Sequence, residues 1–197
     1  MEIRRYVMGE VMTNTYFLIE GKEAIIIDPA CKAEKAISLL EGYELKGILL
    51  THGHFDHLKA VDGLYRKYQV PVFLHKEDEF LARDKYAGAI FGMSAYISCP
   101  TMPIKEGKMS IGSFEFETIY TPGHTPGSVI YVFEDDIFTG DTLFHLSVGR
   151  TDLVGGNERI LRDSLKAFRD FKKDYRIHPG HEAETTLEFE LQYNPYL

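Results

Sequence analysis

Three short segments of this chain are apolar on both faces of a β-strand, and this feature constrains the fold more than any other. They are residues 24–27, 48–50 and 129–133, and they contain only alanine, valine, isoleucine, leucine, tyrosine and phenylalanine. A strand of this kind must be covered on both sides, because neither face can remain in water. Each segment is therefore expected to lie in a sheet that is packed between two other layers.

Helices and further strands are distributed around these segments. The spacing of apolar residues predicts helices over residues 33–41, 58–68, 157–171 and 184–192, with Asn157 as an N-cap. Short apolar runs and alternating patterns predict strands over residues 13–20, 23–28, 45–50, 71–74, 114–120, 128–133, 136–139 and 175–177. The helices thus fall between the strands at two separate places along the chain.

Both observations are satisfied by two sheets that pack face to face and carry their helices on the outside. We therefore expect an α/β (α+β) fold, a four-layer αβ/βα sandwich of two mixed β-sheets. Residues 1–197 are expected to form one domain, because no linker, repeat or low-complexity tract interrupts them. A single doubly wound parallel sheet is the alternative, and the alternation over residues 114–120 disfavours it.

The composition argues against several classes of protein. A net charge of −8 disfavours a broad nucleic-acid-binding surface. The longest apolar run has five residues, whereas a membrane-spanning helix needs about 20. The first residues lack the apolar segment of a secretory signal, and Cys31 and Cys99 are too few for a disulfide framework. We therefore expect a cytoplasmic protein that binds neither nucleic acid nor membrane.

The most specific motif is His-Gly-His-Phe-Asp-His at residues 52–57, where a buried strand gives way to a helix. His52 and His54 are two residues apart in an extended segment, so they point the same way and can share one ion. Asp56 and His57 lie at the turn into the helix and can face a second ion. Neutral imidazole suits zinc, iron and related metals, and carboxylate compensates their charge.

Three further residues of metal-binding type follow predicted strands. His124 lies in a tight Pro-Gly-His-Thr-Pro-Gly loop, Asp141 follows Thr-Gly, and His181 follows Pro-Gly. Each would be a weak signal alone. Together with the cluster at residues 52–57, they place candidate ligands at four strand ends, so the sequence predicts a metal site there.

These motifs, in this order, resemble the metallo-β-lactamase superfamily over nearly the whole chain. Residues 140–144 (Gly-Asp-Thr-Leu-Phe), residues 149–152 (Gly-Arg-Thr-Asp) and the closing Asn194-Pro195 resemble the glyoxalase II-like (hydroxyacylglutathione hydrolase-like) subgroup. The resemblance implies the αβ/βα sandwich and two metal sites. The implied ligands are His52, His54 and His124 for site one, Asp56, His57 and His181 for site two, and Asp141 as a bridge between both ions.

Some residues depart from the pattern of the resembling families. Glyoxalase II carries a further C-terminal helical region that binds glutathione, whereas this sequence closes at Leu197, and Glu182 replaces the glycine of many relatives. Both differences put a glutathione thioester substrate in question. The bridging Asp141 separates the chain from secreted lactam-cleaving members, and His54 separates it from flavodiiron-type domains, which carry glutamate there.

The predicted function is a dinuclear metal-dependent hydrolase with two divalent ions per chain, zinc being favoured over iron and manganese. A metal-bound hydroxide would attack the carbonyl of a small acyl thioester or ester, with Asp56 orienting the hydroxide and Asp141 bridging the ions. A mononuclear iron persulfide dioxygenase is the alternative, because such enzymes resemble this chain around residues 149–152. A metal-dependent nuclease is disfavoured by the acidic charge, and the oligomeric state stays open.

Other residues are assigned supporting parts. Asp28, Thr51 and Thr142 are expected to contact ligands or their loops from behind, and His145 and Arg150 are candidates for substrate contact. The remaining histidines, His75 and His178, are interpreted as packing or surface residues. Residues 86–107 are read as a long loop that either forms one wall of the pocket or covers the sheet.

Overall fold

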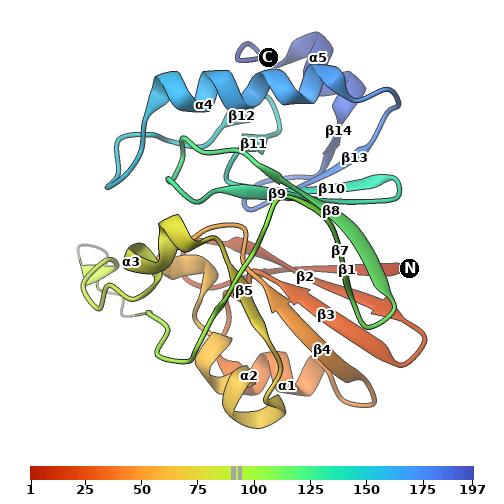
Figure 1. The fold of residues 1–197 in the computed structure, drawn as a ribbon, viewed down its shortest axis with the longest axis vertical. Helices are drawn as coiled ribbons and strands as arrows, with labels where there is room; N and C mark the ends of the chain where they lie inside the picture. Colours follow the sequence, from red (N-terminus) through yellow and green to blue (C-terminus); the bar gives the residue numbers. More distant parts are fainter. Residues whose placement is uncertain (90–91, 93–94) are drawn as a thin grey trace.

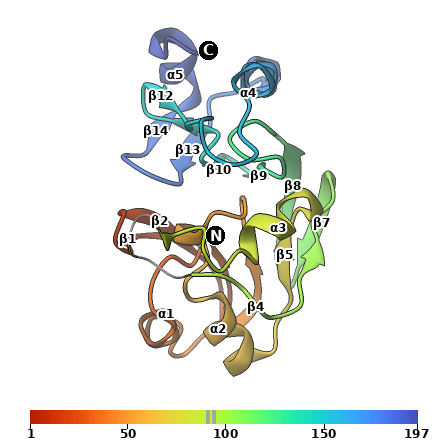
Figure 2. The same cartoon turned by 90° about the vertical axis from the view of Figure 1, so that its left-hand side faces the viewer.

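The computed structural model describes residues 1–89, 92 and 95–197. Two six-stranded β-sheets face each other, α1 and α2 cover the outer face of one sheet, and α4 and α5 cover the outer face of the other (Figure 1). The view turned by 90° shows the same succession of layers (Figure 2). The predicted four-layer sandwich with outer helices is therefore confirmed.

The first sheet has the strand order β1-β2-β3-β4-β5-β6. Its first three strands pair antiparallel and its last three pairings are parallel, so the sheet is mixed. The strands are β1 (Glu2–Met8), β2 (Thr13–Glu20), β3 (Glu23–Ile27), β4 (Glu44–Leu49), β5 (Val72–Leu74) and β6 (Met102–Pro103).

The second sheet has the order β14-β13-β10-β9-β8-β7, and only β10 and β13 pair in parallel. A small hairpin follows β10. The strands are β7 (Gly107–Ile111), β8 (Phe114–Tyr120), β9 (Val129–Phe133), β10 (Asp136–Gly140), β13 (Arg176–Pro179) and β14 (Thr185–Thr186), with β11 (Leu143–Phe144) and β12 (Ser147–Val148) in the hairpin.

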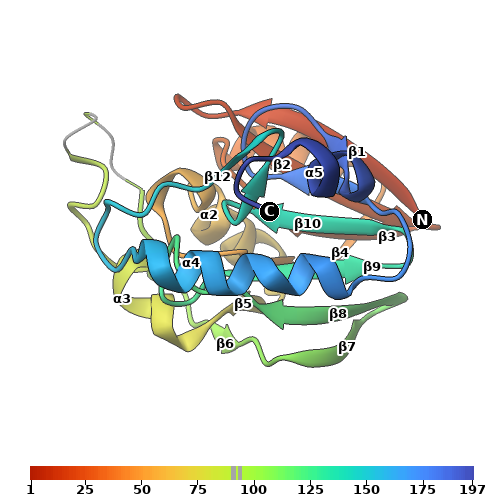
Figure 3. The same ribbon diagram turned by 90° about the horizontal axis from the view of Figure 1, so that it is seen from above.

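The helices are short and lie mainly on the outer faces. The α-helices are α1 (Ala33–Leu39), α2 (Val61–Tyr68), α3 (Glu79–Ala82), α4 (Glu158–Leu165) and α5 (Leu187–Tyr193), and the 3-10 helices are η1 (Phe55–His57), η2 (Lys76–Asp78) and η4 (Lys166–Asp170). Seen from above, α4 runs along the strands of the second sheet (Figure 3). Within the described part of the chain, no helix has the length and apolarity needed to cross a membrane.

Three apolar cores separate the four layers. Alternate residues of β3 face different cores: Ile26 packs toward α1 and α2, whereas Ile25 and Ile27 pack between the sheets. A third core, which includes Ile137 and Leu161, lies between the second sheet and its helices. Residues 24–27 are apolar on both faces because each face meets a different core.

Several predicted boundaries were wrong by a few residues. The helix predicted over 58–68 begins at Val61, because residues 55–57 form the 3-10 turn η1. The helix predicted over 157–171 ends at Leu165 and continues as the 3-10 helix η4, while Asn157 caps it by accepting the Ile160 N–H at 3.1 Å. The first residues of the helix predicted over 184–192 instead pair with β13 as β14, so α5 begins at Leu187.

Other strands carried no clear signal in the sequence. Strand β1 lies at a sheet edge, where six of its seven positions are exposed or half-buried and three carry charged residues, so hydrophobic alternation does not reveal it. The predicted loop 86–107 contains β6 and leads into β7 at Gly107. Its residues 90–91 and 93–94 lie outside the described residues.

Candidate metal centre

The candidate ligands come from loops that follow four strands of the two sheets. Residues 52–57 follow β4, His124 follows β8, Asp141 follows β10, and His181 follows β13. Asp28, which directly follows β3, lies at the same edge. The structure brings all of these positions together at one edge of the sandwich.

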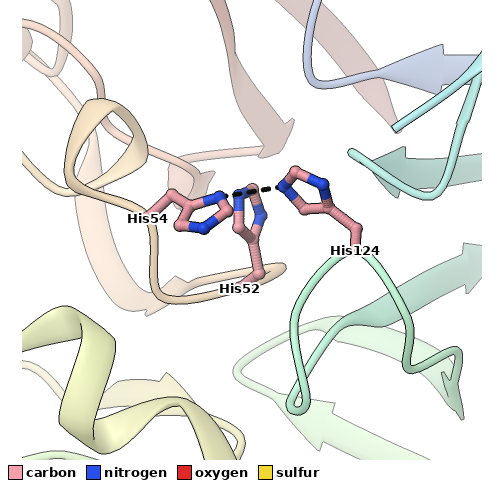
Figure 4. Close-up of side chains that lie close together, drawn as sticks. All are labelled: His52, His54 and His124. Carbon is pink, nitrogen blue, oxygen red and sulfur yellow. Dashed lines mark hydrogen bonds between the residues drawn. The ribbon is translucent and has the colours of Figure 1, made fainter. Parts of the chain in front are cut away.

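The first group, here called the triple-histidine group, consists of His52, His54 and His124. One ring nitrogen from each residue lies within 4.8 Å of the others, and all three side chains are buried. The Nε2 atom of His124 lies 2.9 Å from Nδ1 of His54 (Figure 4). Two separate loops thus present three imidazoles to one point.

The protonation of these imidazoles suits metal binding. Burial lowers the pKa of His54 to about 4 and that of His124 to about 3, and it holds the pKa of His52 well below the ordinary value. All three rings are therefore neutral near pH 7, which is the form that binds a metal ion. Nδ1 of His124 donates to the carbonyl oxygen of Arg150 at 2.7 Å, so the lone pair of the neutral ring lies on Nε2.

The second group, here called the mixed group, consists of Asp56, His57 and His181. The Oδ2 atom of Asp56 lies 3.4 Å from Nε2 of His57 and 3.3 Å from Nε2 of His181. This group is less buried than the first, since the side chains of His181 and Asp56 are 21% and 13% exposed.

Asp141 lies between the two groups. Its Oδ2 atom is 3.5 Å from Nε2 of both His124 and His181, and its Oδ1 atom is 3.5 Å from Nε2 of His57. One carboxylate therefore reaches a member of the triple-histidine group and two members of the mixed group. Burial raises the pKa of Asp141 to about 6, against the opposing effect of the nearby imidazoles.

Unpaired polar atoms at this site fit a positively charged ligand. Among the described residues, five buried side-chain nitrogen or oxygen atoms lack a hydrogen-bond partner, and three of them are His52 Nε2, His57 Nε2 and Asp141 Oδ1. Buried polar atoms are otherwise nearly always paired. Imidazole nitrogen and carboxylate oxygen are ligands of zinc and of other divalent transition metals, so the donor set fits two such ions.

The charges around His57 also favour a positively charged ligand at this site. Burial lowers the pKa of this imidazole, but the carboxylates of Asp56, Asp141 and Asp28 together raise it to about 10. Burial likewise lowers the pKa of His181, but Asp56 and Asp141 outweigh this effect, so the pKa of His181 is raised. Burial raises the pKa of Asp56, but the imidazoles outweigh it and hold that pKa well below its usual range. The carboxylates thus favour a positive charge at the mixed group.

Asp28 orients the candidate ligand His57 directly and His52 through Thr51. Its carboxylate accepts the Thr51 N–H at 2.8 Å and the Thr51 hydroxyl at 2.6 Å, and its Oδ2 lies 3.0 Å from Nδ1 of His57. This last contact turns Nε2 of His57 toward the site. The Thr51 hydroxyl also lies 3.0 Å from Nδ1 of His52. Asp28 has a left-handed φ of 51°, a strained conformation that this network maintains.

The other predicted supporting residues contact the loops rather than the ligand side chains. The Thr142 hydroxyl lies 3.0 Å from that of Thr121, which links the Asp141 loop to the start of the His124 loop. Arg150 pairs with Asp152 at 2.7 Å, and its part in the site is the main-chain oxygen that orients His124. The ring of His145 lies 3.1 Å from the buried Glu190 and stacks on Phe189.

The other residues singled out in the sequence lie outside the two groups. His75 stacks on Tyr120 at 4.6 Å, and His178 is buried between Asp136 and Glu184, in keeping with their interpretation as packing or surface residues. From the loop 86–107, Gly92 and Ala95 line a pocket next to Asp56.

Asp78 is a supporting residue that sequence reasoning missed. Its Oδ2 accepts the Gly53 N–H at 2.8 Å and the Thr125 hydroxyl at 2.7 Å, and its Oδ1 accepts the Gly127 N–H at 2.6 Å. It therefore fastens the loop of His52 and His54 to the loop of His124. The available signal was weak, a carboxylate shortly after the buried strand β5.

Two residues at the start of β2 hold the mixed group and were also missed. The Thr13 hydroxyl donates to Oδ2 of Asp56 at 3.1 Å. The Asn14 amide donates to the carbonyl oxygens of Pro179 and Glu182 at 2.9 and 3.0 Å, which encloses the loop of His181. Short polar residues at a strand start give no sequence signal that distinguishes this role.

Relatives of known sequence match most or all of the chain. It is 36% identical over 208 residues to the probable metallo-hydrolase YqgX of Bacillus subtilis, covering 100% of this chain and 98% of that protein. It is 33% identical over 188 residues to the hydroxyacylglutathione hydrolase GloC of Haemophilus influenzae, covering 90% and 89%.

Solved structures match the fold closely. The BLEG-1 B3 metallo-beta-lactamase superposes with a TM-score of 0.92 at 36% identity, covering 100% of this chain and 99% of that one. TTHA1623, solved in a di-iron-bound form, superposes with a TM-score of 0.91 at 36% identity, covering 98% and 100%. The family model of the metallo-beta-lactamase superfamily matches residues 8–181, a range that includes every candidate ligand. The chain therefore belongs to the metallo-beta-lactamase superfamily.

Proposed function

We propose that this protein is a dinuclear metal-dependent hydrolase that cleaves small acyl thioesters or esters, in the manner of glyoxalase II-like enzymes. The observation that carries the proposal is the position of Asp141. Its Oδ2 lies 3.5 Å from Nε2 of His124 in the triple-histidine group and 3.5 Å from Nε2 of His181 in the mixed group, and its Oδ1 lies 3.5 Å from Nε2 of His57. Such a carboxylate can bridge two ions. The similarity to GloC, a hydroxyacylglutathione hydrolase, supports the thioester class.

Two ions would have separate ligand sets in this arrangement. His52, His54 and His124 would hold one ion, Asp56, His57 and His181 the other, and Asp141 both. When bound, such ions polarise a substrate carbonyl and lower the pKa of a bound water toward ~7. We propose zinc as the first candidate. The di-iron form of the similar TTHA1623 makes iron the second to be assayed.

The residues of the chain then orient the reacting groups. The Thr13 hydroxyl holds Oδ2 of Asp56 at 3.1 Å, which fixes a carboxylate that can orient an attacking water by accepting its hydrogen bond. Asp28 holds Nδ1 of His57 and keeps the second nitrogen directed at the site. Because these supports come from the strand scaffold, little reorganisation is needed during the reaction.

The test combines elemental analysis of the purified protein with assays of thioester hydrolysis and of oxygen consumption on a persulfide. Two divalent ions per chain and thiol release would support the proposal. One iron per chain with oxygen uptake would instead support a persulfide dioxygenase. A His75→Ala variant is the control, because this histidine stacks on Tyr120 and belongs to neither group, so the variant should retain full metal content.

A further inference from the structure

A pocket of about 230 Å³ adjoins the metal centre on the side of the mixed group. Its walls come from the turn between β1 and β2, from Ala30, from Phe55, Asp56 and Lys59, and from residues 92 and 95. Asp56 belongs both to this wall and to the mixed group. A substrate whose carbonyl lies at the metal centre can therefore extend into this pocket.

Lys59 is the one cation among the described residues that line the pocket, and it pairs with Glu10. The two partners are held differently. Lys59 follows the ligand His57 by two positions, and the next residue, Ala60, is tied by its N–H to the Pro29 oxygen at 2.9 Å. Its side chain is 27% exposed, whereas that of Glu10 is 54% exposed.

Glu10 stands on a turn, which makes it the more easily displaced partner. The turn includes Gly9 and Met12, both with left-handed φ angles, of 75° and 58°. Lys59 lowers the pKa of Glu10, and the positive charge of Lys32 acts in the same direction. Two cations thus act on the carboxylate of Glu10, in a chain whose net charge is −8.

We propose that Lys59 binds a carboxylate of the substrate and that Glu10 occupies this position until the substrate displaces it. The substrate class is then an acyl thioester or ester that carries a carboxylate in its acyl or leaving-group part. The proposal rests on the proposed hydrolase function and narrows it. Lys59 would determine specificity without taking part in bond cleavage.

The test uses two substrates that differ in one charge, the acetyl thioesters of 3-mercaptopropionate and of 3-mercaptopropionamide. We expect the wild-type protein to prefer the acidic substrate in kcat/KM. Lys59→Met should lower the ratio of acidic to neutral kcat/KM about tenfold, mainly through KM, because a charge-assisted contact is lost. Glu10→Gln should raise the same ratio several-fold, because the competing carboxylate is removed.

A matched control separates this effect from a general change in charge. Lys173 pairs with Asp135 at another part of the surface, so Lys173→Met removes a paired lysine and should leave the ratio unchanged. A ratio that is the same in Lys59→Met and in the wild type would overturn the proposal. A lower ratio in Glu10→Gln would also overturn it, because Glu10 would then assist binding, as it would for a zwitterionic ligand.

A binding measurement distinguishes failure of this inference from failure of the proposed function. The ketones 5-oxohexanoate and 5-oxohexanamide copy the two substrates with a methylene in place of sulfur, and calorimetry on the metal-loaded protein gives their Kd values. If 5-oxohexanoate binds more tightly than 5-oxohexanamide to the wild type, and Lys59→Met abolishes this difference, the result supports carboxylate binding in the pocket even if neither thioester is hydrolysed. If both thioesters are hydrolysed but the two ketones bind with equal Kd values, the hydrolase function stands and the proposed binding of a carboxylate by Lys59 is rejected.

Discussion

The triple-histidine group and the mixed group lie side by side, yet their environments act oppositely on protons. Burial among other imidazoles lowers the pKa of His54 to about 4, whereas three carboxylates raise that of His57 to about 10. The imidazoles of the triple-histidine group are neutral at neutral pH and can bind a metal ion directly, whereas His57 is protonated and must first release a proton. Histidines of the two groups thus differ in how strongly they hold a proton because their neighbouring residues differ.

The largest expected effect comes from removing the residue that joins the groups. Asp141→Ala should lose at least one ion and lower kcat/KM about a thousandfold or more, because the bridge and its charge disappear. Elemental analysis and thioester hydrolysis measure both losses. Asp135→Ala, at an exposed carboxylate paired with Lys173, is the control. Two ions and normal turnover in Asp141→Ala would refute the bridging role.

Acidification should separate the two groups. Below its pKa of about 10, His57 is protonated in the metal-free site, so each lower pH unit should weaken metal binding at the mixed group about tenfold. His54 and His124 take up protons only near pH 4 and pH 3, so the triple-histidine group should keep its ion. Metal content after dialysis at pH 8, 6.5 and 5 measures this difference. Simultaneous loss of both ions would contradict it.

A third prediction targets the support of one group alone. Asp78→Asn puts an amide N–H against the N–H donors of Gly53 or Gly127, and both belong to loops of the triple-histidine group. Metal affinity at that group should fall about tenfold to a hundredfold. Chelator competition measures it, with Asp62→Asn as control, because Asp62 accepts the backbone N–H groups of residues 98–99 in the same way. Equal weakening of metal binding at the mixed group would argue against a role of Asp78 that is specific to the triple-histidine group.

The smallest effect concerns the loop that carries His181. Glu182 has a φ of 66°, a left-handed conformation that glycine adopts without strain, and its carbonyl oxygen is held by Asn14. Glu182→Gly should therefore stabilise the metal-free protein by about 0.5–1 kcal/mol. Urea denaturation measures the change, and metal content should stay constant. A destabilised variant would mean that the exposed side chain contributes more than the backbone strain costs.

Local patterns accounted for most of the fold and for the types of ligand. Residues 24–27 predicted a strand between two layers because each of its faces had to meet apolar atoms, and alternate residues of β3 do so. The edge strand β1 was missed because most of its positions are exposed or half-buried and carry no apolar alternation. The spacing of residues 52–57 predicted a site that faces two ions.

The sequence by itself thus determined the layered architecture and the residue types at the strand ends, because hydrophobic periodicity and metal chemistry act over a few neighbouring positions. Only the tertiary structure decided which imidazoles meet, how strongly each holds a proton, and which residues support them. Asp78 reaches Thr125 across 47 positions, Thr13 reaches Asp56 across 43, and Lys59 reaches Glu10 across 49. Contacts of this kind arise when distant loops are brought to one sheet edge, and no local pattern encodes them.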